Sequence, residues 1–311
     1  MRNIGCLVNL TTKQEHRLRS AIHPDRLIFL NADLENVKTI ADFNQCEIIF
    51  GNPPKSWFST NTKLRWIQLE SVGFGEYLST DWEHSNKQLQ LTNLAGFFSD
   101  PVSESILAGI LALLRGIDQV SLFRDKYEWV GDDLRPTLRL LKKAKVVMFG
   151  RGAINQRLEK LLEPFQCKVI AFGKSSDQAA IDSELNSADI IVSTVPDTPQ
   201  TRNFFNRSRI MRLKAGAIFV NFGRGSVVDD EALADALESG SLFGAVIDVT
   251  RDEPLPQGHR FWNVSRLILT QHSGGGTANE IDHKIDWFLE NLDRYRNGAT
   301  LHALINFSRG Y

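Results

Sequence analysis

The sequence predicts an α/β protein whose larger part is a doubly wound parallel sheet. Two observations carry that prediction. Between Lys145 and His272, apolar stretches of strand length alternate with helix-like stretches; the apolar ones are KVVMF, KVIAF, DIIVST, AIFVNF, LFGAVIDV and RLILT. A glycine-rich turn directly follows the first of them. Near-continuous apolar strands separated by helices are typical of a parallel sheet that is buried on both faces.

The residues before Asn93 predict a second, smaller α/β domain. Its short apolar runs, IGCLVNL, RLIFL, EIIF and LRWIQL, are separated by turn-rich segments such as Gly51-Asn52-Pro53-Pro54. Next, Asp100 and Pro101 open the helical stretch VSESILAGILALLRGIDQVSLF, which we interpret as a domain-crossing core helix capped by Asp100. Near the end, ANEIDHKIDWFLENLDRYRNG has helical periodicity and finishes at a glycine.

The composition excludes several classes of partner. The 311 residues include 36 Lys and Arg and 37 Asp and Glu, so no net field draws the chain to nucleic acid or to an anionic membrane. Cys6, Cys46 and Cys167 are widely spaced, which predicts buried thiols in a reducing compartment and no metal site. The N-terminal apolar run is too short for a signal peptide, and no stretch is long enough to span a bilayer. We expect a soluble cytoplasmic protein.

The glycine-rich turn has the chemistry of a nucleotide site. It consists of Gly150-Arg151-Gly152, and Ala153 and Ile154 begin the helix-like stretch that follows. Such a turn lets backbone N–H groups and the helix N-terminus face a pyrophosphate. The run KVIAF after the helix completes the strand–helix–strand unit that the motif requires. Asn155 stands where the motif has its third glycine, so a simple tight turn stays an alternative.

Three polar residues follow predicted strands farther along the chain: Arg224, Glu253 and His272. Parallel strands deliver their carboxyl ends to one edge of a sheet, so these side chains can meet there. An arginine fork can grip a carboxylate and polarise the neighbouring carbonyl, and a histidine can transfer a proton. A carboxylate keeps that histidine charged and oriented. The set suits the reduction of a 2-keto acid by a hydride donor, although a surface arginine and a structural histidine are the plain alternatives.

Together these segments resemble the D-isomer-specific 2-hydroxyacid dehydrogenase family, in particular its glyoxylate and hydroxypyruvate reductases. VMFGRGAI is similar to the family's nucleotide loop and STVPDTPQTRNFFN to its loop over the cofactor. VNFGRGSVVDDEAL, GAVIDVTRDEPLP and LTQHSGG are similar to its three catalytic segments, and the closing NFSRGY to a frequent family ending. The resemblance covers nearly the whole chain. The set is highly specific in this order and spacing, although no single segment is.

The resemblance implies which carboxylate pairs with His272. The family places that partner five residues beyond the aspartate of the preceding strand end, and counting from Asp248 gives Glu253. Asp252 is then a solvated loop charge. Asp248 resembles the family residue near the nicotinamide carboxamide, with a strand-end cap as the alternative. The matched segments imply three more cofactor contacts: Val195, Pro196 and Gly274.

The resemblance also implies how the substrate is held. Ser71-Val72-Gly73-Phe74-Gly75 partly matches the family loop whose backbone N–H groups bind the substrate carboxylate, which implicates Val72 and Gly73; a plain loop is the alternative. Residues 1–94 and 277–311 would form a discontinuous flavodoxin-like substrate domain, and residues 95–276 a Rossmann dinucleotide-binding domain. Gln271 replaces the family's usual proline, which we expect to loosen the turn before His272 while leaving the imidazole in place.

The end of KVIAF bears on the choice of nicotinamide. Sites that prefer NAD usually carry an acidic residue there, which binds the ribose hydroxyls. This chain has Gly173-Lys174-Ser175-Ser176 instead, and Arg151 adds positive charge nearby. The segment favours the 2′-phosphate of NADP(H), with NAD(H) possible if Lys174 is only a solvated turn residue.

We therefore expect an NAD(P)-dependent D-2-hydroxyacid dehydrogenase that works as a 2-keto acid reductase on glyoxylate, hydroxypyruvate or a related small acid. A family resemblance also implies a homodimer. One alternative is a nucleotide-sensing protein like the corepressors that share this fold. Another is a lyase or hydrolase with an internally used NAD, against which the set of Arg224, Glu253 and His272 argues.

Overall fold

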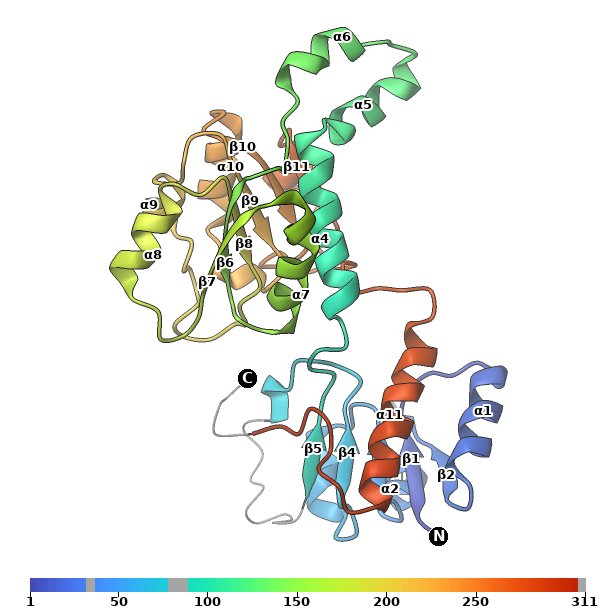
Figure 1. Ribbon diagram of the computed structural model, residues 1–311. Helices are drawn as coiled ribbons and strands as arrows, with labels where there is room; N and C mark the ends of the chain where they lie inside the picture. The colour runs from blue at the N-terminus through green and yellow to red at the C-terminus, as the bar shows by residue number, and fades with distance from the viewer. Residues whose placement is uncertain (32–36, 78–88, 307–311) are drawn as a thin grey trace. The chain divides into compact units, whose positions relative to one another are not determined.

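The computed structural model describes residues 1–31, 37–77 and 89–306, so the last five residues of the closing NFSRGY lie outside the described part. The chain divides into two compact units (Figure 1). Unit 1 comprises Met1–Ala95 and Thr277–Tyr311, and unit 2 comprises Gly96–Gly276. Each unit is built on its own parallel sheet.

Unit 2 contains a six-stranded sheet in the order β11-β10-β9-β8-β6-β7, with every neighbouring pair parallel. The six predicted strands are confirmed. Their bounds are β6 Lys145–Phe149, β7 Lys168–Phe172, β8 Ile190–Ser193, β9 Ala217–Asn221, β10 Leu242–Ile247 and β11 Leu267–Leu269. After β6 the chain adds β7 on one side and then returns to place β8 on the other. This change of direction is a topological switch point, where sheets of this kind bind dinucleotides beyond the carboxyl ends of the strands.

Helices cover both faces of this sheet, as Figure 1 shows. Alternate residues of β6 point to opposite faces, so Val146 and Met148 belong to one core and Val147 and Phe149 to the other. The helices that contribute to the first core are α4 Ser99–Leu114 and α7 Ala153–Leu162. The helices that contribute to the second are α8 Gln178–Leu185, α9 Arg207–Ile210 and α10 Asp230–Glu238. This two-sided burial explains why the strands are apolar throughout.

The predicted long helix after Asp100 is divided. α4 ends at Leu114, and Gly116, with φ +67°, separates it from α5 (Ile117–Phe123). Asp100 is not the cap, because the helix begins one residue earlier and Asp100 lies in its first turn. α4 lies wholly within unit 2, and α5 and α6 (Gly131–Leu134) extend from its end with no buried residue. Among the described residues no single helix is long and apolar enough to cross a membrane; α4 and α5 meet the criterion only as a pair bent by 67°.

Unit 1 contains a five-stranded parallel sheet in the order β2-β1-β3-β4-β5, which is the flavodoxin-like order. Four of its strands match the predicted runs, and the fifth was not predicted. The strands are β1 Asn3–Cys6, β2 Arg26–Phe29, β3 Ile48–Phe50, β4 Trp66–Gln68 and β5 Gln90–Thr92. The α-helices within the described residues of this unit are α1 Thr12–Ile22, α2 Val37–Phe43 and the predicted C-terminal helix, α11 Glu280–Arg296.

The C-terminal helix is part of the core of unit 1. Phe288 of α11 stacks on Phe50 and Trp66 with ring centroids 4.5 and 5.4 Å apart, next to α1. α2 contributes to the core on the opposite face. Cys6 and Cys46 are buried in these two cores, whereas Cys167 of unit 2 is only half-buried.

Candidate active site

The nucleotide loop, Gly150–Gly152, follows β6 at the switch point. Gly150 has φ +106°, and a Cβ there would lie 2.8 Å from Thr194 Oγ1 just beyond β8, so this position requires glycine. Gly152 is the N-cap of α7, where no side chain caps the first amides and a Cβ would meet nothing within 4 Å. Ala153 and Ile154 form the first turn. Uncapped amides at an open helix N-terminus fit the pyrophosphate of a nicotinamide dinucleotide.

Asn155 takes the place of the motif's third glycine without disturbing the loop. Its side chain is buried, and Nδ2 donates to the carbonyl oxygens of Phe149 at 3.1 Å and Gly150 at 2.8 Å. The amide therefore ties the first turn of α7 to the end of β6. A glycine would allow the same approach without this bond, so the departure from the motif does not argue against a nucleotide site.

Positive charge gathers at the end of β7. Arg151 Nε and Nη2 both donate to the carbonyl oxygen of Ala171, at 3.1 and 2.9 Å, which lays the guanidinium beside Gly173. Lys174 and Ser175 follow and are exposed. Within the described residues around this strand end, the position that would carry an acidic residue is thus glycine flanked by two cationic side chains.

The loop after β8 carries Val195 and Pro196. Its shape is fixed by Thr201, whose Oγ1 donates to the Pro196 carbonyl at 2.6 Å and accepts from Thr198 N at 2.8 Å. Asp197 pairs with Arg202 at 2.9 Å, and this hydrogen bond holds the pKa of the Asp197 carboxyl below its usual range.

Arg224 is held from both sides by glycines that have no room for a side chain. A Cβ on Gly223 would lie 2.4 Å from the carbonyl oxygen of Val195 in the loop after β8. A Cβ on Gly225 would lie 2.0 Å from the carbonyl carbon of Thr250 in the turn after β10. Arg224 itself is exposed, and its Nη1 donates to the Gly223 carbonyl at 2.8 Å. The backbone therefore locks the arginine between the ends of β8 and β10 while leaving its side chain accessible.

Glu253 and His272 are in direct contact: Oε2 of the carboxylate lies 2.7 Å from Nδ1 of the imidazole. The other oxygen, Oε1, accepts from the backbone N–H of Thr250 at 3.0 Å, so the carboxylate faces the histidine in a fixed orientation. Asp252 contributes only its carbonyl oxygen to this turn, which accepts from Thr250 Oγ1 at 2.8 Å. The side chains of His272 and Glu253 are 53 % and 37 % exposed, so the imidazole is open to a substrate.

The turn before His272 has a left-handed backbone at Gln271, and the expected loosening of this turn stays a prediction. Gln271 and His272 both have left-handed backbones, with φ +53° and +55°, and the His272 N–H donates to the Asp248 carbonyl at 2.6 Å. Proline fixes φ near −65°. A proline at position 271 is therefore incompatible with this turn, which explains the departure from the family pattern.

Asp248 is the junction of the segments around the site. It is buried, and its Oδ1 accepts from Thr270 Oγ1 at 2.5 Å and from the Gly274 N–H at 3.0 Å. Ser105 of α4 in turn donates to the Gly274 carbonyl at 3.0 Å, and a Cβ on Gly274 would collide with Phe222 at 2.5 Å. The aspartate thus ties together the segments after β10 and β11.

In unit 1, the exposed residues Val72 and Gly73 belong to a loop that is held by two asparagines. Asn93 Nδ2 donates to the Val72 carbonyl at 2.6 Å. Asn52 Oδ1 accepts from the Glu70 N–H at 3.0 Å, and its Nδ2 donates to Ser71 Oγ at 3.2 Å. In the described part of the chain the backbone N–H groups of Val72 and Gly73 donate no hydrogen bond, so they could bind an anion.

A buried ion pair lies behind this loop. Lys284 of α11 is 7 % exposed, and its Nζ lies 2.7 Å from Glu280 Oε1 and 3.8 Å from Glu70 Oε2. Burial raises the pKa of the Glu70 carboxyl, an effect that the lysine charge opposes. The pair fastens the start of the loop to α11.

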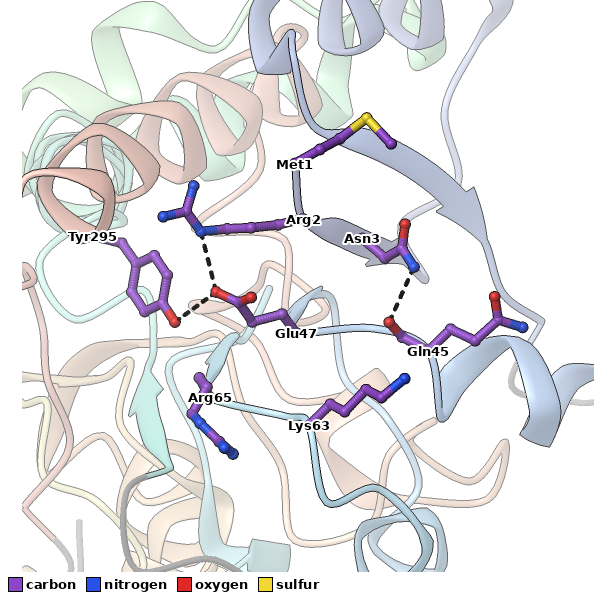
Figure 2. Close-up of a pocket in the computed structure, with 8 residues that line it drawn as sticks. All are labelled: Met1, Arg2, Asn3, Gln45, Glu47, Lys63, Arg65 and Tyr295. Carbon is purple, nitrogen blue, oxygen red and sulfur yellow. Dashed lines mark hydrogen bonds and ion pairs between the residues drawn. The ribbon is translucent and has the colours of Figure 1, made fainter.

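One cavity of unit 1, about 550 Å³ in volume, lies away from this loop (Figure 2). Apart from Tyr295 of α11, its lining residues lie before or at the start of β1, β3 and β4, at the amino ends of these strands, whereas the loop follows the carboxyl end of β4. Its centre is occupied by Glu47, which accepts from Arg2 Nε and from the Tyr295 hydroxyl, each at 3.1 Å. Burial raises the pKa of Tyr295 to about 12. This cavity is not part of the candidate site.

The geometry agrees with the matches to known proteins. Residues 107–274, more than half of the chain, match the family model described as D-isomer specific 2-hydroxyacid dehydrogenase, NAD binding domain. The chain belongs to this family.

Relatives that carry enzyme names match much of the chain. D-3-phosphoglycerate dehydrogenase of Haemophilus influenzae is 33% identical over 223 residues, which cover 66% of this chain and 53% of the relative. Glyoxylate reductase of Thermofilum pendens is 28% identical over 260 residues, covering 78% of this chain and 75% of the relative. A crystal structure of a D-isomer specific 2-hydroxyacid dehydrogenase family protein from Aeromonas salmonicida has a TM-score of 0.82 and 26% identity over 98% of this chain and 99% of that one.

Membership makes the protein a nicotinamide-dependent oxidoreductase of small 2-hydroxy or 2-keto acids with an α/β Rossmann-type fold. The structure brings Glu253 and His272 into contact and joins the Arg224 segment to the turn before Glu253. It gathers the predicted cofactor residues at the carboxyl ends of β6, β7, β8, β10 and β11. Val72 and Gly73 lie in the other unit, at the carboxyl end of its own sheet.

Sequence reasoning missed the residues that hold the site together. They are Asn52, Asn93, Ser105, Asn203, Arg251 and Thr270. Each acts through a contact with a segment distant in the sequence, so no local pattern marks it. Asn93 and Thr270 each lie directly beyond or at a strand end, which was the one available indication.

Proposed function

We propose that the protein reduces a small 2-keto acid to the D-2-hydroxy acid, with NADPH as the preferred hydride donor. The observation that carries this proposal is the 2.7 Å contact between His272 and Glu253 beside the glycine-locked Arg224. An arginine fork for the carboxylate and a carboxylate-held histidine for the proton are what keto-acid reduction requires.

In this reaction the chain's own residues bind, orient and protonate the substrate. Arg224 holds the substrate carboxylate and polarises the keto oxygen, and the backbone N–H groups of Val72 and Gly73 bind the carboxylate as well. His272 gives its proton to the keto oxygen, while Glu253 stabilises the charged imidazole beforehand. On the family resemblance, Asp248 would lie near the carboxamide of a bound nicotinamide. The bound dinucleotide supplies the hydride.

The preference for NADPH rests on the end of β7. Arg151 is laid beside Gly173 by its two hydrogen bonds to Ala171, and Lys174 and Ser175 follow. A 2′-phosphate there would meet two cations and a hydroxyl, whereas the ribose of NADH would find no carboxylate to bind its hydroxyl groups.

We propose glyoxylate, hydroxypyruvate or a related small acid as the substrate, and this choice rests on the family alone.

A homodimer is also proposed, and the arm beyond α4, which contains α5 and α6, supports it. Tyr127 and Trp129 on this arm are each 96 % exposed, and Ile117 and Leu122 of α5 are 58 % and 66 % exposed. Exposed apolar patches of this kind mark interfaces. Trp129→Ser with Tyr127→Ser should lower the mass measured by light scattering. A cytoplasmic location stays a prediction.

A substrate screen that follows NADPH absorbance tests the proposal. Glyoxylate should be reduced to the achiral glycolate, and hydroxypyruvate and pyruvate to their D-hydroxy acids, with a higher kcat/KM for NADPH than for NADH. Lys174→Ala should weaken NADPH more than NADH. Absence of turnover with every 2-keto acid would refute the reaction, and a clear preference for NADH would refute only the cofactor assignment.

A further inference from the structure

The turn that carries Glu253 is closed on itself. Thr250 N–H donates to Glu253 Oε1 at 3.0 Å, and Thr250 Oγ1 donates to the Asp252 carbonyl at 2.8 Å. These bonds make residues 250–253 a small rigid unit. The direction of the carboxylate toward His272 therefore depends on where this turn is fixed as a whole.

The side chain of Arg251 leaves this turn and reaches two other segments. Its Nη2 donates to Asn203 Oδ1 at 2.8 Å and to the Val228 carbonyl at 3.1 Å. Val228 follows Arg224 after the 3₁₀ turn Gly225–Val227, and Asn203 lies in the loop after β8. One guanidinium thus joins the segments that follow three neighbouring strands, β8, β9 and β10.

The backbones of the same segments are in close contact. Gly225 lies against the peptide between Thr250 and Arg251, where a Cβ would be 2.3 Å from the Arg251 nitrogen. Asn203 has φ +51°, and its N–H donates to the Ser226 carbonyl at 2.9 Å. Packing therefore brings the segments together, and the arginine supplies the directional bonds between them.

We propose that Arg251 is a positioning residue for the proposed reductase reaction: it fastens the Glu253 turn to the segment after Arg224 and so holds the carboxylate against His272. Arg251 does not touch the reacting atoms. The inference rests on the proposed function for its kinetic readouts, but the contact it describes can be measured without turnover.

Several charges face this network. Asp230, at the start of α10, is attracted by Arg251 and by His259, whose Nε2 lies 3.7 Å away; burial raises the pKa of Asp230 to about 6 against these two attractions. Asp252 belongs to the turn itself, and Asp248 precedes it on the chain. Because Arg251 is one of the two attractions on Asp230, its removal should raise the pKa of Asp230 further, so the pH profiles are also compared in an Asp230→Asn background.

The test compares Arg251→Ala with Arg251→Lys and with a matched control. Arg212→Ala removes an exposed arginine that pairs with Asp182 at 3.6 Å and makes no contact with these segments in the described structure. Arg251→Ala should lower kcat/KM about tenfold to a hundredfold, mainly through kcat, because two charge-assisted bonds are lost. The alkaline limb of kcat/KM should move to lower pH, and NADPH affinity should change less than about threefold. Arg251→Lys should be intermediate, and Arg212→Ala unchanged.

Two further measurements separate positioning from general loosening. The imidazole titration of His272, followed by NMR in the full chain, should shift to lower pH in Arg251→Ala and stay in place in Arg212→Ala. Asn203→Gly keeps the left-handed backbone and removes one acceptor, so its effect should be smaller and not additive with Arg251→Ala. A lower melting temperature with an unmoved pH profile and an unmoved His272 titration would overturn the inference. If the unmodified protein reduced no 2-keto acid, the proposed function would fail, and the His272 titration would still decide the role of Arg251.

Discussion

The carboxyl ends of the two sheets present different chemistry. In unit 2 the strands end in functional side chains, and glycines fix them: Gly223 and Gly225 lock Arg224 against neighbouring backbone. In unit 1 the corresponding loop presents backbone N–H groups, and side chains fix it: Asn52 and Asn93 bond its main chain. In unit 2 the backbone fixes the functional side chains, whereas in unit 1 side chains fix the functional backbone. A functional side chain can be recognised in a sequence. A functional backbone N–H group can be recognised only through the side chains that hold its loop.

The largest effect should come from the side chain of unit 2. Arg224→Ala should lower kcat/KM roughly a thousandfold or more, because a charged fork on a carboxylate in a closed site is a strong interaction. KM for the keto acid should rise, kcat should fall, and NADPH affinity should change little. Steady-state kinetics with Arg212→Ala as the control measures this. Near-normal turnover of Arg224→Ala would show that this arginine does not bind the substrate.

The next effect concerns the proton. Glu253→Gln keeps the shape of the side chain and removes the charge 2.7 Å from His272 Nδ1. The charged imidazole then loses its counter-charge, so the alkaline limb of kcat/KM for reduction should move to lower pH. Asp252→Asn is the matched control, because that carboxylate makes no contact with the imidazole in the described structure. If the alkaline limb moved in Asp252→Asn and stayed in place in Glu253→Gln, Asp252 and not Glu253 would be the partner of His272.

A smaller effect is expected from the support of unit 1. Asn93→Ala removes the donor 2.6 Å from the Val72 carbonyl, so the loop should lose its shape while every side chain of unit 2 stays intact. KM for the keto acid should rise about tenfold, and KM for NADPH should not change. Asn52→Ala, which frees the other side of the loop, should act in the same direction. An unchanged KM in both variants would show that this loop does not bind the carboxylate.

The strands and the C-terminal helix were predictable because burial leaves a direct record in the sequence. β6 and its neighbours are apolar on both faces, and α11 keeps its apolar residues on the side that packs against Trp66. The break after α4 was missed because the apolar pattern continues past Gly116 into α5, where none of these residues is buried. β5 (Gln90–Thr92) reads QLT, a single apolar residue between two polar ones, so no apolar run marks it.

The candidate site also has a part that the sequence predicted and a part that it could not. The family resemblance implied Glu253 over Asp252, because it supplies the count of five residues from Asp248, and the structure has Glu253 in contact with His272. Nothing in the sequence connects Arg251 with Asn203 or Asn93 with Val72, because these contacts exist only once distant strand ends lie side by side. The left-handed φ of +53° at Gln271, which a proline could not adopt, was likewise not visible in the sequence.

The smallest effect compares two aspartates, one in each unit, and concerns stability alone. Asp25 in unit 1 is buried, which opposes its charge, but the Arg2 N–H at 2.8 Å and the Arg296 guanidinium outweigh this and lower its pKa. Asp230 in unit 2 has its pKa raised from 3.8 to about 6, because burial outweighs the attraction of His259 and Arg251. The two carboxyls therefore have opposite pH dependence.

For Asp230 the protonated form is favoured by folding, so its stabilising contribution is complete below about pH 4 and is lost as the pH rises through about 6. For Asp25 the charged form is favoured, and its contribution is lost only as the pH falls below the usual range of a carboxyl. Asp230→Asn should thus raise the free energy of unfolding at pH 8 by on the order of 1 kcal/mol and have less effect at pH 5. Asp25→Asn should lower it at pH 8. Denaturant unfolding at both pH values measures this, and a stabilised Asp25→Asn or a destabilised Asp230→Asn at pH 8 would contradict the assigned signs.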